Sequence, residues 1–247
     1  MKHFLDLGSH KFEGLRQFCQ QLLMDGSWSV RCYEANPLVY KEALISAFFF
    51  KRKFRDFKFF NRAVLDRNGT VIFHCHKGAW TDSSKKEFTE GYTVGSNALE
   101  NTPECDIANG RVFRIVDMEV PCVDINDILD DICKADDQAE IYIKCDIEGS
   151  EFRVLPRMLR SKYIRNVKQL YVEWHERFWY KDGMEEKLRE KATYINRLRE
   201  LNVEYFLHDN VITTSADATP VRQRLSRPLR RFITRMKLQH PTLFRHH

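Results

Sequence analysis

Residues 140–155 read EIYIKCDIEGSEFRVL, and this stretch decides the fold. It opens with a short apolar run, Glu140–Asp146, of the kind found in strands that are buried on both faces of a parallel sheet. A helical pattern, Ser150–Arg160, follows after only a few residues. A buried strand joined to a helix by a short turn is the repeating unit of α/β proteins, so the sequence indicates that class.

The same alternation of strand and helix patterns extends along the rest of the chain. Further strands are predicted at His3–Leu7, Ser29–Glu34, Phe57–Leu65, Thr70–Cys75, Arg111–Val120, Lys168–Trp174, Val203–Leu207 and Val211–Thr213. Further helices are predicted at Leu15–Leu23, Pro37–Phe50, Asp124–Cys133 and residues 184–200. This order predicts a doubly wound, mostly parallel sheet with helices on both faces.

Two connections between these elements carry their own signals. The run Asp66–Gly69 is typical of a hairpin turn, so we expect the strands on either side of it to pair. Residues 78–110 are polar and irregular, and a loop of that length in a compact domain predicts a functional segment.

Composition supports a folded protein in a reducing compartment. Of 247 residues, 43% are hydrophobic and 13% aromatic, which excludes wholesale disorder. The longest apolar run, Ala47–Phe50, is too short to span a bilayer, and residues 1–12 lack the pattern of a secretory signal. No two of the seven cysteines lie within ten residues of each other, which predicts neither a metal knuckle nor a disulfide framework. We therefore expect a cytoplasmic protein.

Charge is distributed unevenly along the chain. Residues 218–247 contain eight basic residues and no acidic one, and removing them leaves 32 basic against 35 acidic residues. Ser226 and Pro228 are typical of a helix start, and the apolar residues that follow share one face. The sequence thus divides into residues 1–217 and a basic segment, 218–247. That segment either docks on the rest of the chain or contacts an anionic lipid, a nucleic acid or a partner domain.

The residues that follow the strands are the best placed to bind a ligand, because ligands of doubly wound sheets bind at the carboxyl ends of the strands. Asp6 ends the first strand, and Gly8–His10 follow it, where a small residue lets the backbone approach a ligand. Glu34 ends the second strand, and a carboxylate there can accept both hydroxyls of a ribose. Together these features predict a nucleoside-type cofactor.

A second group of acidic residues follows the strand that ends near Cys145. Asp146, Glu148 and Glu151 concentrate negative charge there, which must be balanced by a cation, a proton or hydrogen-bond donors. A helix dipole accounts for the last two carboxylates but less well for the first. His175 follows the next strand and is the best general-base candidate by residue type, although a structural role is equally open.

These segments, in this order, resemble the FkbM-type S-adenosylmethionine-dependent methyltransferases. The resemblance covers roughly residues 3–176 and rests on FLDLGSHKFEG (4–14), CYEANP (32–37), NRAVLDRNGT (61–70), VPCVDINDIL (120–129), IYIKCDIEGSEFRVL (141–155) and LYVEWH (170–175). It implies a Rossmann-like class I methyltransferase domain over residues 1–217. The sequence departs from the family's usual pattern at His10 and Phe12, where Asn and Gly are usual.

The resemblance also implies roles for individual residues. Those expected to bind S-adenosylmethionine are Asp6, Gly8, Ser9, His10, Glu34 and Asn36. Among them, Glu34 is expected to hold the ribose hydroxyls and Asn36 to lie near the adenosine. Those expected at the reacting end are Asp146, Glu148 and His175.

We expect an O-methyltransferase that acts on a sugar hydroxyl, which Trp80–Ser84 and Tyr92 suit as stacking and hydrogen-bonding groups. We expect the hydroxyl to pass its proton to His175 or Asp146. Alternatively, a Mg²⁺-type ion held by Asp146 and Glu173 lowers the pKa of the hydroxyl. The alternatives are methylation of a small-molecule or protein nitrogen, a nucleic-acid-associated protein that uses the Arg-rich tail, and a binding module without catalysis. The acidic body disfavours a nucleic-acid partner.

The start of the chain carries one further expectation. The sequence begins directly at its first strand, without the leading helix that many such enzymes have. We therefore expect the chain to be one domain of a longer polypeptide.

Overall fold

The computed structural model of the chain describes residues 1–80, 91–92, 96–99, 111–179 and 183–208. All of them belong to one compact unit, Met1–Val211. The basic segment 218–247, the predicted strand Val211–Thr213 and most of the predicted loop at 78–110 lie outside the described residues.

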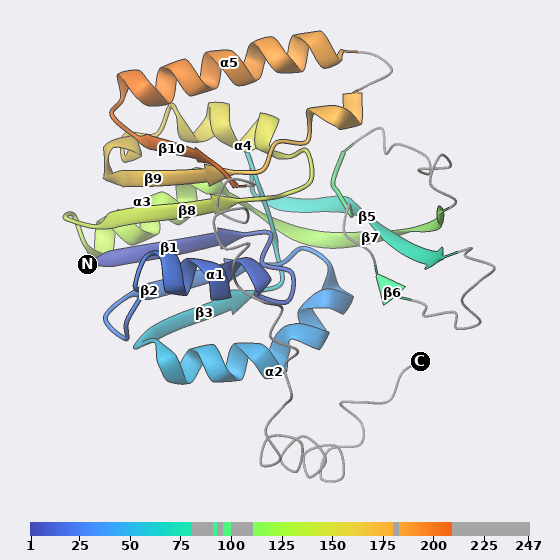
Figure 1. Cartoon of the computed structure of the whole chain (residues 1–247), viewed down its shortest axis with the longest axis horizontal. Helices are drawn as coiled ribbons and strands as arrows, with labels where there is room; N and C mark the ends of the chain where they lie inside the picture. Colours follow the sequence, from blue (N-terminus) through green and yellow to red (C-terminus); the bar gives the residue numbers. More distant parts are fainter. Residues whose placement is uncertain (81–90, 93–95, 100–110, 180–182, 209–247) are drawn as a thin grey trace. The chain divides into compact units, whose positions relative to one another are not determined.

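A six-stranded parallel sheet forms the core of this unit (Figure 1). Its strands are β1 (Lys2–Leu7), β2 (Ser29–Tyr33), β3 (Asp56–Phe60), β8 (Glu140–Cys145), β9 (Val167–Val172) and β10 (Glu204–Leu207). They are arranged in the order β10-β9-β8-β1-β2-β3, and every neighbouring pair is parallel. The strand order reverses between β1 and β8, which places the switch point at the ends of these two strands. The predicted doubly wound sheet is confirmed.

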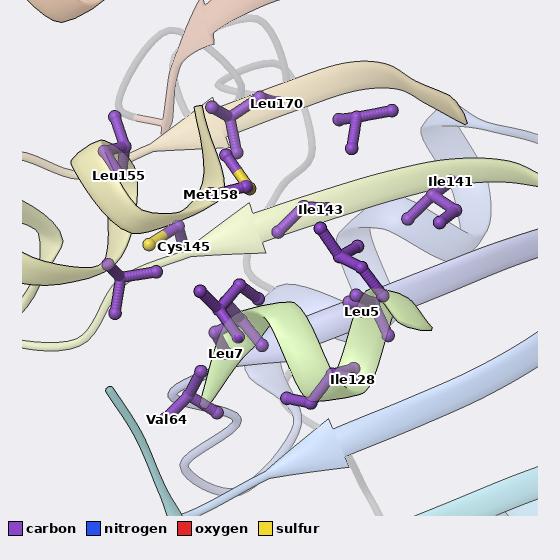
Figure 2. Close-up of a cluster of buried hydrophobic side chains, with 14 of the residues drawn as sticks. Leu5, Leu7, Val64, Ile128, Ile141, Ile143, Cys145, Leu155, Met158 and Leu170 are labelled. Carbon is purple, nitrogen blue, oxygen red and sulfur yellow. The ribbon is translucent and has the colours of Figure 1, made fainter. Parts of the chain in front are cut away.

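Helices cover both faces of this sheet. They are α1 (Glu13–Gln21), α2 (Pro37–Lys53), α3 (Ile125–Ala135), α4 (Glu151–Met158) and α5 (Met184–Glu200), with short 3₁₀ turns at Ile164–Asn166 and Glu176–Trp179. Successive residues of β1 point to opposite layers, as the pleat of a strand requires. Phe4 packs in the cluster that α1 and α2 cover, whereas Leu5 and Leu7 pack against α3 and α4. Figure 2 shows Leu5 and Leu7 in one cluster with Ile128 and Leu155.

The ends of two helices illustrate what local sequence can and cannot predict. Asn36 caps α2, because its Oδ1 accepts the backbone N–H groups of Leu38 and Val39 at 3.0 and 3.4 Å, and Pro37 needs no such partner. The start of this helix is therefore confirmed. The first helix ends earlier than its apolar pattern predicted, since Leu23 is 84% exposed and has a φ of 48°.

A second, four-stranded sheet with the order β4-β7-β5-β6 is present that the sequence did not predict. Its strands are β4 (Ala63–Leu65), β5 (Gly69–Trp80), β6 (Gly91–Tyr92) and β7 (Arg111–Asp124). The prediction of one strand over Phe57–Leu65 is wrong, because its two halves belong to different sheets. Asn61 turns the chain between them by donating its Nδ2 hydrogens to the carbonyl oxygens of Glu34 and Ala35, at 2.8 and 3.1 Å.

The predicted hairpin at Asp66–Gly69 is also wrong. The strands on either side of it, β4 and β5, both pair with β7, which lies between them. The β4–β7 pairing is parallel, whereas β5 and β7 form a long antiparallel ladder from Gly69–Cys122 to Trp80–Arg111. Turn residues predict only that the chain changes direction locally. Here β7, which is distant in the sequence, lies between β4 and β5 and pairs with both.

Among the described residues, no helix is both long and apolar enough to cross a bilayer. The six cysteines in this part of the chain carry free, buried thiols.

Candidate active site

A cleft lies at the carboxyl ends of β1, β2 and β8, and it encloses about 710 Å³ including solvent at its mouth. Its lining consists of Gly8, His10, Tyr33, Glu34, Ala35, Asn36, Val39, Arg62, Ala63, Val64, Phe73, Ser96, Ala98, Asp146, Ile147, Glu148 and Ser150. Six of the nine residues predicted for the site therefore line it. The other three, Asp6, Ser9 and His175, are buried behind the lining.

Gly8 sets the distance between the turns that follow β1 and β8. Its φ of +79° is in the left-handed region, and an ideal Cβ built on it would lie 1.8 Å from the carbonyl oxygen of Asp146. Its N–H donates to the carbonyl of Tyr33 at 3.0 Å. No other residue fits here, and the bare backbone forms part of the wall of the cleft.

Glu34 follows β2 and is held by backbone groups. Its Oε2 accepts the N–H of His10 at 2.8 Å, and its Oε1 accepts the N–H of Asn36 at 2.8 Å. Burial raises the pKa of this carboxyl, and the two backbone hydrogen bonds oppose that rise. Each carboxylate oxygen has a second acceptor position, so both oxygens can accept a further donor from a ligand in the cleft.

Asp6 and Ser9 shape the first turn from beneath. The Asp6 carboxylate is fully buried, with its Oδ1 3.4 Å from Nζ of Lys144. The same Nζ donates to the carbonyl of Gly8 at 2.6 Å and lies 3.1 Å from Oδ2 of Asp146. The Ser9 hydroxyl donates to the carbonyl of Asp6 at 3.0 Å. Burial raises the pKa of Asp6 and would lower that of Lys144, but the two carboxylates raise the lysine pKa instead.

His175 lies at the centre of four carboxylates. Its Nδ1 is 3.0 Å from Oε1 of Glu151, and its Nε2 is 3.1 Å from Oε2 of Glu148, 3.6 Å from Oε1 of Glu173 and 3.9 Å from Oδ1 of Asp146. Burial lowers the pKa of His175, but these carboxylates outweigh burial and raise its pKa to about 9. The four carboxylates thus favour the protonated form of the imidazole.

Glu151 fixes the acidic turn that follows β8. Its fully buried carboxylate accepts the N–H groups of Ile147 and Gly149, each at 2.9 Å, in addition to its contact with His175. The turn needs this support because Glu148 has a φ of 50°. The sequence identified the excess of acidic residues here but not that this carboxylate holds the others in place.

Several lining residues were not predicted. Arg62 enters from the break between β3 and β4, and the polar pair with Asn61 inside an apolar run was the signal that could have revealed it. Phe73 and Ala98 come from the second sheet and the segment beside it. No sequence signal marks these two, because the pairing that brings them to the cleft is long-range.

Two sets of side chains are close enough to share a metal ion. One consists of Asp146, Glu148 and His175, and the other of Asp146, Glu173 and His208. In each set the possible ligand atoms lie within 4.8 Å of one another. The pair expected to hold a Mg²⁺-type ion, Asp146 and Glu173, thus lies beside two imidazoles.

The methyltransferase FkbM domain family matches residues 6–213, a span that includes every residue named above as lining the cleft. No curated protein and no solved structure matches the chain. Because the match covers most of the sequence, the chain belongs to the FkbM methyltransferase family, and the resemblance seen in the sequence is confirmed.

Proposed function

We propose that this member of the FkbM methyltransferase family is an S-adenosylmethionine-dependent O-methyltransferase that methylates a sugar hydroxyl. The observation that carries the proposal is that one cleft is lined by the turns that follow β1 and β2 and by the turn that follows β8. The first two turns, which we call the donor end, offer the bare backbone of Gly8 and the carboxylate oxygens of Glu34, with Asn36 beside them. The turn after β8, which we call the acidic end, offers the carboxylates of Asp146 and Glu148.

The first end suits the methyl donor. When bound, S-adenosylmethionine supplies an activated methyl group for in-line transfer to a nucleophile. Glu34 has an acceptor position on each oxygen for the two ribose hydroxyls, and Gly8 leaves room for the donor against bare backbone. The cleft is lined by the carboxylates of Asp146, Glu148 and Glu34 and by one guanidinium, that of Arg62. Negative charge therefore exceeds positive charge along this lining, which favours a cationic ligand.

The second end suits an acceptor hydroxyl. Burial alone would raise the pKa of Asp146, but the charges of Lys144 and His175 lower it, so this carboxylate stays ionised. An ionised carboxylate can accept the hydrogen bond of a hydroxyl and orient its oxygen toward the methyl group. We assign this task to Asp146 with Glu148 beside it. A positioned base of this kind contributes roughly 10²–10⁴-fold to such reactions.

Calorimetry with S-adenosylhomocysteine tests the donor end. We expect the wild-type chain to bind it and Glu34→Ala to lose most of that affinity while keeping its circular dichroism spectrum. Glu200→Ala, which removes an exposed carboxylate from the far end of α5, is the matched control and binds normally. Unchanged binding by Glu34→Ala would exclude this assignment.

Mass spectrometry of candidate acceptors tests the substrate class. We expect glycans incubated with the enzyme and S-adenosylmethionine to gain a methyl group on a hydroxyl oxygen. Parallel reactions with amine-bearing small molecules and peptides test whether the enzyme methylates nitrogen instead. Methylation confined to nitrogen would refute the sugar-hydroxyl proposal while leaving the donor site intact.

A further inference from the structure

We infer that the acidic end of the cleft binds a divalent transition-metal ion of the Mn²⁺ type, with His175 Nε2 and one oxygen each of Asp146 and Glu148 as ligands. The site rests on geometry alone. Its role in catalysis deepens the proposed function, since an ion there lowers the pKa of an acceptor hydroxyl.

The first observation is a buried nitrogen that faces only acids. His175 is 0% exposed, and its Nε2 makes no hydrogen bond with any described residue. Three carboxylate oxygens surround that nitrogen at 3.1, 3.6 and 3.9 Å. A buried polar atom without a hydrogen bond is costly, and a cation between this nitrogen and the oxygens of Asp146 and Glu148 would give the nitrogen a partner.

The second observation is the support behind the imidazole. Nδ1 of His175 hydrogen-bonds Oε1 of Glu151, and because an ionised carboxylate only accepts, Nδ1 carries the hydrogen. Two backbone N–H groups donate to the carboxylate of Glu151 and fix its orientation toward the imidazole. A histidine that binds a metal nearly always donates its other ring N–H to such a partner, which leaves Nε2 free to bind the ion.

The third observation is how the carboxylates divide their oxygens. Asp146 places Oδ2 against Nζ of Lys144 at 3.1 Å and its Oδ1 toward Nε2 of His175. Glu173 places Oε2 against Nδ1 of His208 at 3.2 Å and its Oε1 toward the same Nε2. Each carboxylate is thus anchored by one oxygen and presents the other to a common point, as outer partners of metal ligands do.

The spacing of these atoms agrees with shared coordination. Two atoms that each lie about 2.1 Å from one ion are roughly 3.0–3.4 Å apart for angles between a right angle and the tetrahedral angle. The Nε2–Oε2 distance between His175 and Glu148, 3.1 Å, falls in this range. The oxygen of Asp146, at 3.9 Å, needs to move inward by roughly 0.5–0.9 Å to reach it.

The ligand set selects among ions. Imidazole suits transition metals, whereas Mg²⁺ prefers oxygen ligands and keeps several waters. The nitrogen of His175 therefore favours Mn²⁺ over the Mg²⁺ that carboxylates alone suggested. A proton on Nε2 of His175 competes with the metal ion, because it gives an imidazolium that pairs with the same carboxylates. Binding of the ion would displace that proton.

Electron paramagnetic resonance of the full chain titrated with MnCl₂ tests the inference. We expect a single tight Mn²⁺ site per chain, with pulsed spectra showing coupling to an imidazole nitrogen. His175→Asn keeps a donor toward Glu151 but has no atom at the position of Nε2. We expect it to lose the nitrogen coupling and to bind Mn²⁺ about 10–100-fold more weakly.

Two further variants make the test specific. Glu148→Gln keeps the shape of that ligand and is also expected to weaken Mn²⁺ binding. His74→Asn is the matched control, because His74 pairs with a single carboxylate, that of Asp117, at 2.6 Å, outside the cleft lining. We expect this variant to bind Mn²⁺ and to show nitrogen coupling as the wild type does.

The outcomes separate the two proposals. If the wild type binds no Mn²⁺, or if folded His175→Asn binds it as tightly and with the same spectrum, the cluster is an ion pair and the metal site is overturned. S-adenosylhomocysteine binding is measured separately without metal. Loss of that binding with Mn²⁺ binding intact would overturn the donor site alone.

Discussion

The two ends of the cleft hold their carboxylates by different means. At the donor end, Glu34 is fixed by backbone N–H groups from His10 and Asn36, which follow two adjacent strands. At the acidic end, backbone N–H groups hold Glu151, but Asp146 lies against the charged side chains of Lys144 and His175. Backbone donors persist whatever the side chains are, whereas the position of Asp146 depends on a balance of buried charges. The comparison teaches that the acidic end is the more fragile of the two.

The largest effect is expected where that balance is broken. Lys144→Met leaves the buried carboxylate of Asp6 beside that of Asp146 without a cation, which should destabilise the protein by roughly 3–5 kcal/mol. Urea unfolding measures this. Lys134→Met removes an exposed lysine paired with Asp130 and is expected to change little. Equal effects of the two substitutions would refute the contrast between the ends.

The next effect probes the backbone that joins the two ends. Gly8→Ala places a Cβ against the carbonyl of Asp146 and strains a positive φ, which should cost about 2–4 kcal/mol. Gly69→Ala shares the positive φ, +123°, but meets nothing within 4 Å, so only strain of about 1–2 kcal/mol is expected. Unfolding free energies compare the two variants. Indistinguishable values would mean that the close approach of the two turns is not what requires glycine.

A smaller effect separates binding from stability at the donor end. Glu34→Gln keeps the side chain's shape but removes its charge, so S-adenosylhomocysteine affinity should fall by about 1.5–3 kcal/mol, roughly 10–150-fold. Stability should change little, because the backbone of the two turns remains paired with Tyr33 and Phe60. Calorimetry and urea unfolding on one preparation measure both. A stability loss as large as that of Lys144→Met would contradict the difference between the ends.

The smallest effect concerns an exposed pair at the donor end. The hydrogen bond with Glu13 raises the pKa of His10 above its ordinary 6.5. The stabilisation is therefore complete below pH 6.5 and is lost as the pH rises through the raised value. Because His10 is partly exposed, we expect only about 0.2–1 kcal/mol. Unfolding free energies of the wild type and His10→Asn between pH 6 and 8 should converge with rising pH, and a constant difference would refute the assignment.

The parallel sheet could be predicted because each of its units carries local signals. The cap at Asn36 and Pro37 marks α2, and the apolar pattern of Glu140–Cys145 marks a strand buried on both sides. The second sheet could not, because its strands pair across long stretches of sequence. The run Phe57–Leu65 reads as one strand, and only the side chain of Asn61, bonded to carbonyls after β2, shows why it is two.

The same distinction applies to the site. Gly8 and Glu34 could be predicted because each directly follows a strand and acts through its own backbone or neighbouring backbone. The surroundings of His175 could not, since its partners come from the ends of β8 and β9 and from α4. Residue type favoured a proton acceptor there, whereas the assembled carboxylates favour a cation.

Lys144 gives the two ends a common contact. Its Nζ donates to the carbonyl of Gly8 at 2.6 Å and lies 3.1 Å from the carboxylate of Asp146. If both ligands bind as proposed, a ligand that moves the first turn would alter the field at the second, and the two binding events would be thermodynamically linked. Such coupling is reciprocal, so an ion that tightens donor binding is itself tightened by the donor to the same degree. The strength of that coupling would then depend on a single buried ammonium group.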